Sequence, residues 1–155
     1  MNKNIKKIFN KIMHNHFEVD KERNVYTVDI FPEVVTSEKY FDFRDEIIMT
    51  NKYNILNKYI IALCKIFMYD KNVYILDKNK ENDILKLDEV GALYEFEKYI
   101  TESIIAQSPM PLLLDDLKIG FLLGDGYVTY TDLGNGKINL VTDIFEKEGL
   151  YIEKG

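Results

Sequence analysis

The sequence predicts one α+β domain over residues 1–155, with a mainly antiparallel sheet packed against two or three helices. Segments with helical spacing of apolar residues alternate with short runs of strand-forming residues. The last third of the chain has consecutive strand patterns joined by glycine turns. A length of 155 residues favours one domain with a sizeable core, and 46% hydrophobic residues argue against wholesale disorder.

An amphipathic helix is expected over residues 1–16. Its apolar residues recur at helical spacing and its lysines lie largely on the other side: Ile5, Ile8, Phe9, Ile12 and Met13 against Lys3, Lys6, Lys7 and Lys11. We expect this helix to dock on the core, and a helix for a membrane surface or an anionic partner is the alternative. It lacks the apolar run and cleavage site of a secretory signal. The sequence contains no run of about 18 apolar residues, so no membrane span is predicted.

The next segment predicts a strand pair and a central helix. Residues 24–30 alternate as an edge or near-edge strand should, and residues 40–44 are its expected antiparallel partner. A helix begins near Asn51, and its wide apolar stripe includes Cys64. This helix is therefore expected to lie centrally in the core.

The middle of the chain predicts a further strand and a second helix. Residues 73–76 are typical of a short buried strand, and residues 78–82 of a polar turn. The second helix is expected to start near Asp88, a good N-cap residue. Its predicted buried side consists of Leu93, Phe96, Ile100 and Ile104.

Residues 119–153 are expected to form a C-terminal β-meander. Residues 127–131 are strand formers, residues 137–142 alternate, and Asp125-Gly126 and Asn135-Gly136 favour tight hairpin turns. The glycines fit neither G-x-G-x-x-G nor a P-loop, both of which lead into a helix. We therefore interpret them as turns between strands, with no helix following them.

Few residues support catalysis, and we assign no catalytic residue, cofactor or metal site. His14 and His16, the only histidines, are interpreted as an exposed pair at a helix end. The single cysteine, Cys64, excludes a disulfide framework within the chain, suits a buried inert thiol and favours a cytoplasmic location. A Mg²⁺ site that joins Asp115 or Asp116 to a distant acid such as Asp77 is the enzyme alternative.

Charge is distributed unevenly along the sequence. Residues 1–17 contain four lysines and no acid, whereas the whole chain has a net charge of −6, so the remaining residues carry −10. An acidic body disfavours nucleic acid, because such binding requires lysines and arginines to neutralise phosphates. It favours a basic protein partner through electrostatic steering, with ordinary solubility as the alternative explanation.

Tyrosines beside carboxylates mark the candidate partner-binding residues, since tyrosine rings anchor interfaces while carboxylates steer a cationic partner. Core packing is the alternative role for these tyrosines. The first candidate set consists of Asp115, Asp116, Asp125, Tyr127, Tyr130 and Asp132. A second candidate is Tyr94 with Glu95 on the second helix.

The expected function is that of a non-catalytic, acidic, cytosolic binding protein, namely a stoichiometric inhibitor or immunity-type protein that engages a basic protein partner. In general composition the chain resembles bacterial or phage immunity proteins and nuclease inhibitors, although no motif carries that likeness. A carboxylate- or Mg²⁺-dependent enzyme built on the sheet is one alternative. A structural subunit of a homo- or hetero-oligomer is the other.

Overall fold

The structure, a computed structural model, describes residues 2–17, 25–29, 42, 55–77, 83–124 and 126–154. Its helices are α1 (Asn2–Phe17), α3 (Ile55–Phe67), α4 (Ala92–Ile105) and α5 (Ile138–Lys147). Its strands are β1 (Val25–Asp29), β2 (Val73–Asp77), β3 (Asp83–Lys86), β4 (Met110–Leu114), β5 (Ile119–Gly124), β6 (Tyr127–Asp132) and β7 (Tyr151–Lys154).

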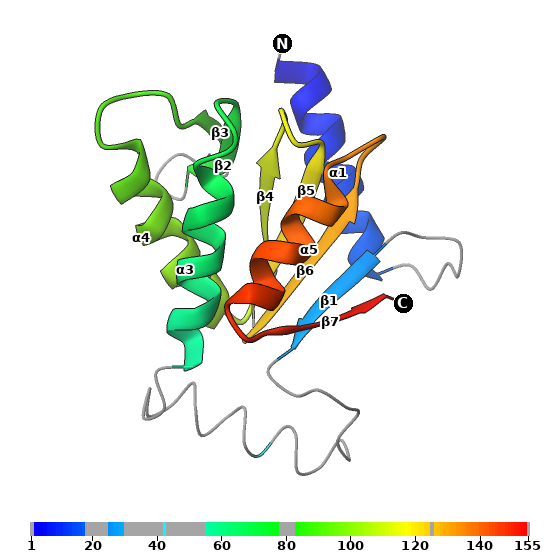
Figure 1. Cartoon of the computed structure of the whole chain (residues 1–155). Coiled ribbons are helices and arrows are strands. Elements are labelled where there is room, and N and C mark those ends of the chain that lie inside the picture. The colour runs from blue at the N-terminus through cyan, green and yellow to red at the C-terminus, as the bar shows by residue number, and fades with distance from the viewer. Residues whose placement is uncertain are drawn as a thin grey trace.

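The described strands form one seven-stranded sheet in the order β3-β2-β4-β5-β6-β1-β7, and every neighbouring pair is antiparallel. Helices α3, α4 and α5 lie on one face of this sheet, and α1 lies on the other (Figure 1). The predicted α+β class with a mainly antiparallel sheet is confirmed.

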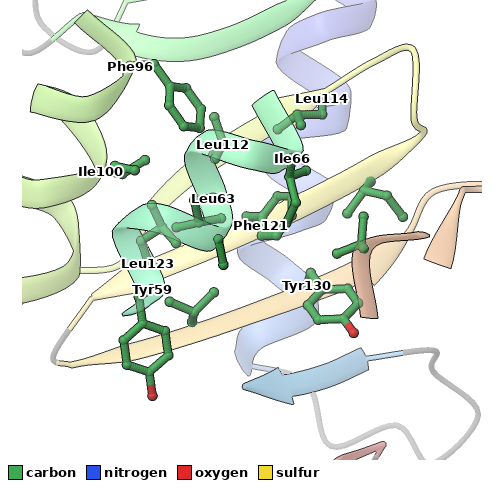
Figure 2. Packing of buried hydrophobic residues seen from close by; sticks show 14 of the residues in the cluster. Tyr59, Leu63, Ile66, Phe96, Ile100, Leu112, Leu114, Phe121, Leu123 and Tyr130 are labelled. Carbon is green, nitrogen blue, oxygen red and sulfur yellow. The ribbon is translucent and has the colours of Figure 1, made fainter. Parts of the chain in front are cut away.

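The larger core lies between the sheet and its three helices (Figure 2). Leu63 and Ile66 of α3 and Phe96 of α4 are fully buried against strand residues that include Leu112 and Phe121. Phe121 and its neighbour Leu122 point to opposite faces because strand side chains alternate. Both are nevertheless buried, so β5 is covered on both sides.

A smaller core lies under α1, as expected for a docked N-terminal helix. Ile5, Phe9 and Ile12 of α1 pack against a separate apolar cluster of the sheet, which consists of Tyr74, Leu113 and Leu122. The side chains of Lys6, Lys7 and Lys11 are exposed. No helix among the described residues is long and apolar enough to cross a membrane.

The C-terminal region contains the expected strands and one unexpected helix. Strands β5 and β6 pair as a hairpin and β7 follows, all within residues 119–153. The prediction of a strand over residues 137–142 was wrong, since α5 occupies residues 138–147 and β1 lies between β6 and β7. The longer pattern explains this, because Val141, Ile144 and Phe145 recur at helical spacing and are all buried.

The neighbours of β1 also differ from the prediction. Its expected partner, residues 40–44, lies outside the described residues apart from Asp42. Both sides of β1 are instead occupied, one by β6 and the other by β7. Strand β3 was not predicted, and the expected turn over residues 78–82 that precedes it lies outside the described part of the chain.

Helix α4 begins later than predicted. Gly91, with φ of 90°, occupies its N-cap position, so Asp88 is not the cap. The buried residues of α4 include Phe96, Ile100 and Ile104 as expected. Leu93 was wrongly placed among them, since it lies on the first turn at the helix end and is 43% exposed.

Gly120 sets how closely α1 approaches the sheet. Replacing it with alanine is therefore expected to destabilise the protein, whereas glycine-to-alanine changes often stabilise one. A Cβ at Gly120 would lie 2.5 Å from Ile12 Cγ1, although Gly120 has no positive φ. Elsewhere such a Gly→Ala change stabilises a protein by about 0.4–1 kcal/mol. Here we expect Gly120→Ala to lower the free energy of unfolding by about 1–3 kcal/mol, because the added methyl overpacks the contact.

Urea unfolding followed by circular dichroism measures this effect in two backgrounds. In the Ile12→Ala background the obstructing side chain is gone, so Gly120→Ala is expected to become neutral or stabilising. Equal effects of Gly120→Ala in both backgrounds would show that α1 does not dock through this contact.

Candidate functional site

The six residues of the first predicted set do not share one surface. Asp115 and Asp116 lie in the turn between β4 and β5. Asp132 ends β6 beside that turn, since the Leu133 N–H donates to the Lys118 carbonyl at 2.9 Å. Tyr127 begins β6 at the opposite end of that strand, and Asp125 lies outside the described residues.

Tyr130 belongs to the core and is withdrawn from the candidate partner-binding set. Its side chain is only 1% exposed, and its ring stacks on Tyr26 and Phe145 at centroid distances of 5.1 and 5.6 Å. Its hydroxyl hydrogen-bonds to that of Thr142, and burial raises its pKa to about 12. A partner therefore has no access to this ring in the folded protein.

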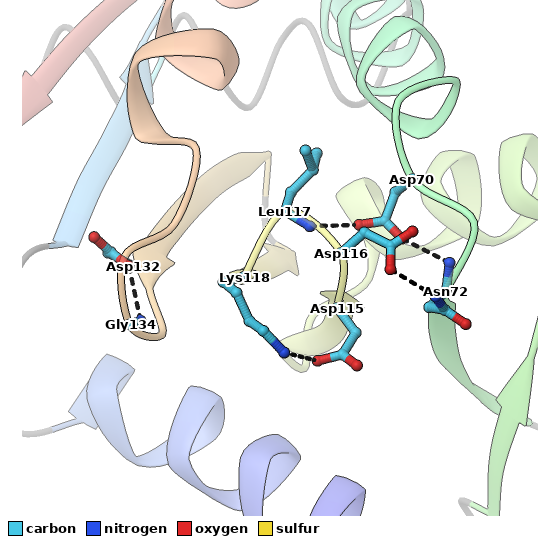
Figure 3. Close-up of polar contacts among 8 residues, drawn as sticks. All are labelled: Asp70, Asn72, Asp115, Asp116, Leu117, Lys118, Asp132 and Gly134. Carbon is cyan, nitrogen blue, oxygen red and sulfur yellow. Dashed lines mark hydrogen bonds and ion pairs between the residues drawn. The ribbon is translucent and has the colours of Figure 1, made fainter.

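The carboxylates of Asp70 and Asp116 join two turns of the chain (Figure 3). Asp70 accepts hydrogen bonds from the N–H groups of Asn72 and Leu117 at 2.7 and 2.9 Å. Asp116 accepts one from the Lys71 N–H at 2.8 Å and one from the Asn72 side-chain amide at 2.6 Å. The turn after α3 is thus held against the turn between β4 and β5.

Asp115 points away from this network, although it is adjacent to Asp116 in sequence. Its carboxylate pairs with the Lys118 ammonium at 2.9 Å (Figure 3). Each of these neighbouring acids is therefore engaged within the turn region, and the two do not face each other as an acid/base pair would.

The surroundings of Asp70 and Asp116 shift their pKa values in opposite directions. Burial raises the pKa of Asp70 despite the two backbone hydrogen bonds that it accepts. Hydrogen bonds from the Asn72 side chain and the Lys71 backbone lower the pKa of the exposed Asp116. Burial therefore dominates the pKa shift of Asp70, and hydrogen bonding dominates that of Asp116.

Asp132 takes the place that an anion would occupy in a glycine-rich loop before a helix. One of its carboxylate oxygens accepts the N–H groups of Gly134 and Gly136, at 2.8 and 2.7 Å. These glycines precede α5, contrary to the expectation that no helix follows them. Because the protein's own carboxylate uses both N–H groups, the loop needs no external phosphate.

The acids considered for a Mg²⁺ site lie far apart. The Asp115 N–H donates to the Asn72 carbonyl at 2.9 Å, whereas Asp77 lies five residues farther along β2. At about 3.3 Å per residue this separates the two acids by roughly 16 Å. Among the described residues, no group of three or more histidine, cysteine or acidic side chains is placed to hold a metal ion.

The histidines lie in α1 and the cysteine lies in α3. His14 and His16 lie in the last turns of α1, and the description of that segment covers the backbone only. Cys64 is a half-buried thiol whose pKa burial raises to about 11, with a further contribution from the charge of Glu97. A thiol with such a pKa is protonated near neutral pH and is a poor nucleophile.

The second predicted candidate, Tyr94 with Glu95, lies on a prominent surface. Tyr94 is 68% exposed and Leu93 is 43% exposed, beside the exposed carboxylates of Glu95 and Glu97. Helix α4 lies at the outer edge of the helical layer, next to α3 (Figure 1). We call the exposed side chains of residues 88–98 the α4 face.

The α4 face combines apolar area with concentrated negative charge. Residues 88–98 contain four carboxylates and one lysine, a net charge of −3. Neither Glu95 nor Glu97 forms an ion pair with another described residue. Val90, in the turn before the helix, is fully exposed. An exposed aromatic ring and aliphatic side chains rimmed by charged residues are typical of a protein-binding surface.

The end of α3 extends this apolar area. The rings of Phe67 and Phe96 contact at a centroid distance of 4.4 Å, so the C-terminal end of α3 lies beside the first turns of α4. Met68, which follows Phe67, is 69% exposed. Sequence patterns alone did not identify Met68, Val90 and Leu93, because an apolar residue near a helix end is usually taken for part of the core.

No family model, curated protein or solved structure matches this chain. The function is therefore inferred from the α4 face and from the chemistry of its residues.

The opposite pKa shifts of Asp70 and Asp116 predict opposite pH dependences of stability. The ordinary pKa of both groups is 3.8. Folding raises the pKa of Asp70 above 3.8. The contribution of Asp70 to the free energy of unfolding is therefore fully present below pH 3.8 and is lost as the pH rises through the folded-state pKa. Folding lowers the pKa of Asp116 below 3.8. The contribution of Asp116 to the free energy of unfolding is therefore fully present above pH 3.8 and is lost as the pH falls through the folded-state pKa.

Urea unfolding of the wild type, Asp70→Asn and Asp116→Asn between about pH 2.5 and 6 measures both effects. The wild-type free energy minus that of Asp70→Asn is expected to fall as pH rises. The corresponding difference for Asp116→Asn is expected to rise. Two slopes of the same sign would contradict the network described above.

Proposed function

We propose that this chain is a non-catalytic binding protein whose α4 face engages a basic protein partner in the cytoplasm, in the manner of a stoichiometric inhibitor. The observation that carries the proposal is the exposure of Tyr94 and Leu93 beside Glu95 and Glu97, which form no ion pair with another described residue, in a segment (residues 88–98) with a net charge of −3. The single, half-buried cysteine suits a reducing compartment.

The residues of the α4 face have complementary roles in such a contact. The Tyr94 ring supplies apolar area and a hydroxyl at a small cost in side-chain entropy, which is why tyrosine is common at the centre of interfaces. The carboxylates of Glu95 and Glu97 attract a basic surface before contact and so raise the association rate. They would equally repel acidic proteins and nucleic acids.

Four other acidic residues are engaged by groups of the protein itself, which favours a binding role over a catalytic one. Asp70, Asp116 and Asp132 are occupied by backbone N–H groups of the protein itself. Asp115 is paired with Lys118. Glu95 and Glu97, which form no ion pair with another described residue, lie on an exposed helix that offers a partner an extended contact surface.

A comparative capture experiment tests this function. Tagged wild-type protein is incubated with a lysate of its source cells at low salt, and bound proteins are released with high salt and identified by mass spectrometry. We expect one basic protein, captured by the wild type and lost with the Tyr94→Ala/Glu95→Lys variant. Glu146→Lys reverses another exposed helical glutamate, on α5, and serves as the matched control, which should still capture the partner.

Purified partner then allows the two contributions to be separated. Glu95→Lys is expected to reduce mainly the association rate, by several-fold at low salt and by less at high salt. Tyr94→Ala is expected to accelerate dissociation and to weaken binding by about 2 kcal/mol. Equal capture by all variants, or binding that salt does not affect, would refute the proposal.

A further inference from the structure

A groove opens between α1 and the sheet, on the face opposite α4. It has a volume of about 440 Å³, within the range of small-molecule sites. Its walls are mainly apolar and come from the helix and from three strands: Phe9, Met13, Leu76, Ile84, Met110 and Pro111.

The groove exists because β2 and β4 separate at this point. Their pairing ends with Ile75 opposite Leu112. One residue farther on, the Tyr99 hydroxyl lies between the strands, where it donates to the Pro111 carbonyl at 2.7 Å and receives the Leu76 N–H at 3.5 Å. Leu76 and Pro111 are thereby held apart, and their side chains lie on the α1 side of the sheet.

The polar groups of the groove are concentrated at its mouth. Lys6 and Asn10 lie one turn apart on α1, and Ser108 faces them from the segment before β4. All three residues are exposed, whereas Pro111 is buried. Among the described residues of the lining, Lys6 is the only charged one, and it forms no ion pair with another described residue. A ligand would therefore place an anionic group at the mouth and an apolar chain inside.

We propose that this groove binds a medium-chain fatty acid, with its carboxylate at Lys6 and Asn10 and its alkyl chain between α1 and the sheet. Charge selects the head group, because the exposed Lys6 of the lining attracts a carboxylate. The apolar walls select the tail, since they offer few polar groups to a sugar or a nucleotide. The site is independent of the α4 face, which lies across the sheet.

Isothermal titration calorimetry with sodium dodecanoate, below its micelle-forming concentration, tests the proposal on the full chain. Saturable binding of one dodecanoate per chain is expected. Lys6→Ala should raise the dissociation constant by about fivefold, as loss of one exposed charge contact does. The matched control is Lys7→Ala, which removes a neighbouring exposed lysine outside the groove and should change binding by less than about twofold.

Two further ligands separate the contributions of head group and tail. Butyrate retains the carboxylate without the long chain, and dodecyltrimethylammonium retains the chain with the opposite charge, so both should bind much more weakly. The chain has no tryptophan, so Ser108→Trp adds a single fluorescent reporter at the mouth, and its emission should shift as dodecanoate binds.

Absence of saturable dodecanoate binding would overturn the proposal. Equal losses in Lys6→Ala and Lys7→Ala would do the same, because the effect would then come from the general charge of α1. Sedimentation with phosphatidylglycerol vesicles tests whether the protein binds an anionic membrane surface in place of a free fatty acid. Binding to vesicles without binding of free dodecanoate would make α1 a membrane-surface helix and would also refute the fatty-acid site.

Discussion

The side chains of β4 and β5 are buried on both faces of the sheet, and this double burial requires a helical layer on each side. Leu112, Leu114 and Phe121 pack under α3, α4 and α5, while Leu113 and Leu122 pack under α1. The continuous apolar runs of these two strands are typical of a sheet that is covered twice. Without α1, the second face would expose a contiguous apolar patch.

This arrangement separates the charges of the molecule. The lysine-rich α1 lies on one side of the sheet, and the acidic α4 lies on the other. Each helix presents its charged residues outward because its apolar residues are needed for the sheet. Two surfaces of opposite sign result, one suited to an anionic ligand and the other to a basic partner. The turns after β4 and β6 contribute to neither surface, since Asp116 and Asp132 accept hydrogen bonds from backbone N–H groups and Asp115 pairs with Lys118.

Sequence patterns predicted the elements whose signal is long, and they failed where a short pattern was ambiguous. The helices around residues 2–17 and 55–67 follow from apolar spacing over several turns. Residues 137–142 satisfy both a strand and a helix period, and only Ile144 and Phe145 beyond them decide for the helix. Of the candidate site, the sequence indicated Tyr94 and Glu95. It could not show that Tyr130 is buried, because that depends on contacts with Tyr26 and Phe145, which are distant in the chain.

The central claim is that partner recognition occurs on the α4 face. Hydrogen–deuterium exchange of the chain, with and without the captured basic protein, tests it most directly, since bound surfaces protect backbone amides from exchange. Added protection is expected across residues 88–98 and at the end of α3 near Met68, with α1 and β7 unchanged. Protection confined to the turns at residues 115–118 and 132–137 would contradict the account and would return recognition to the acidic turns.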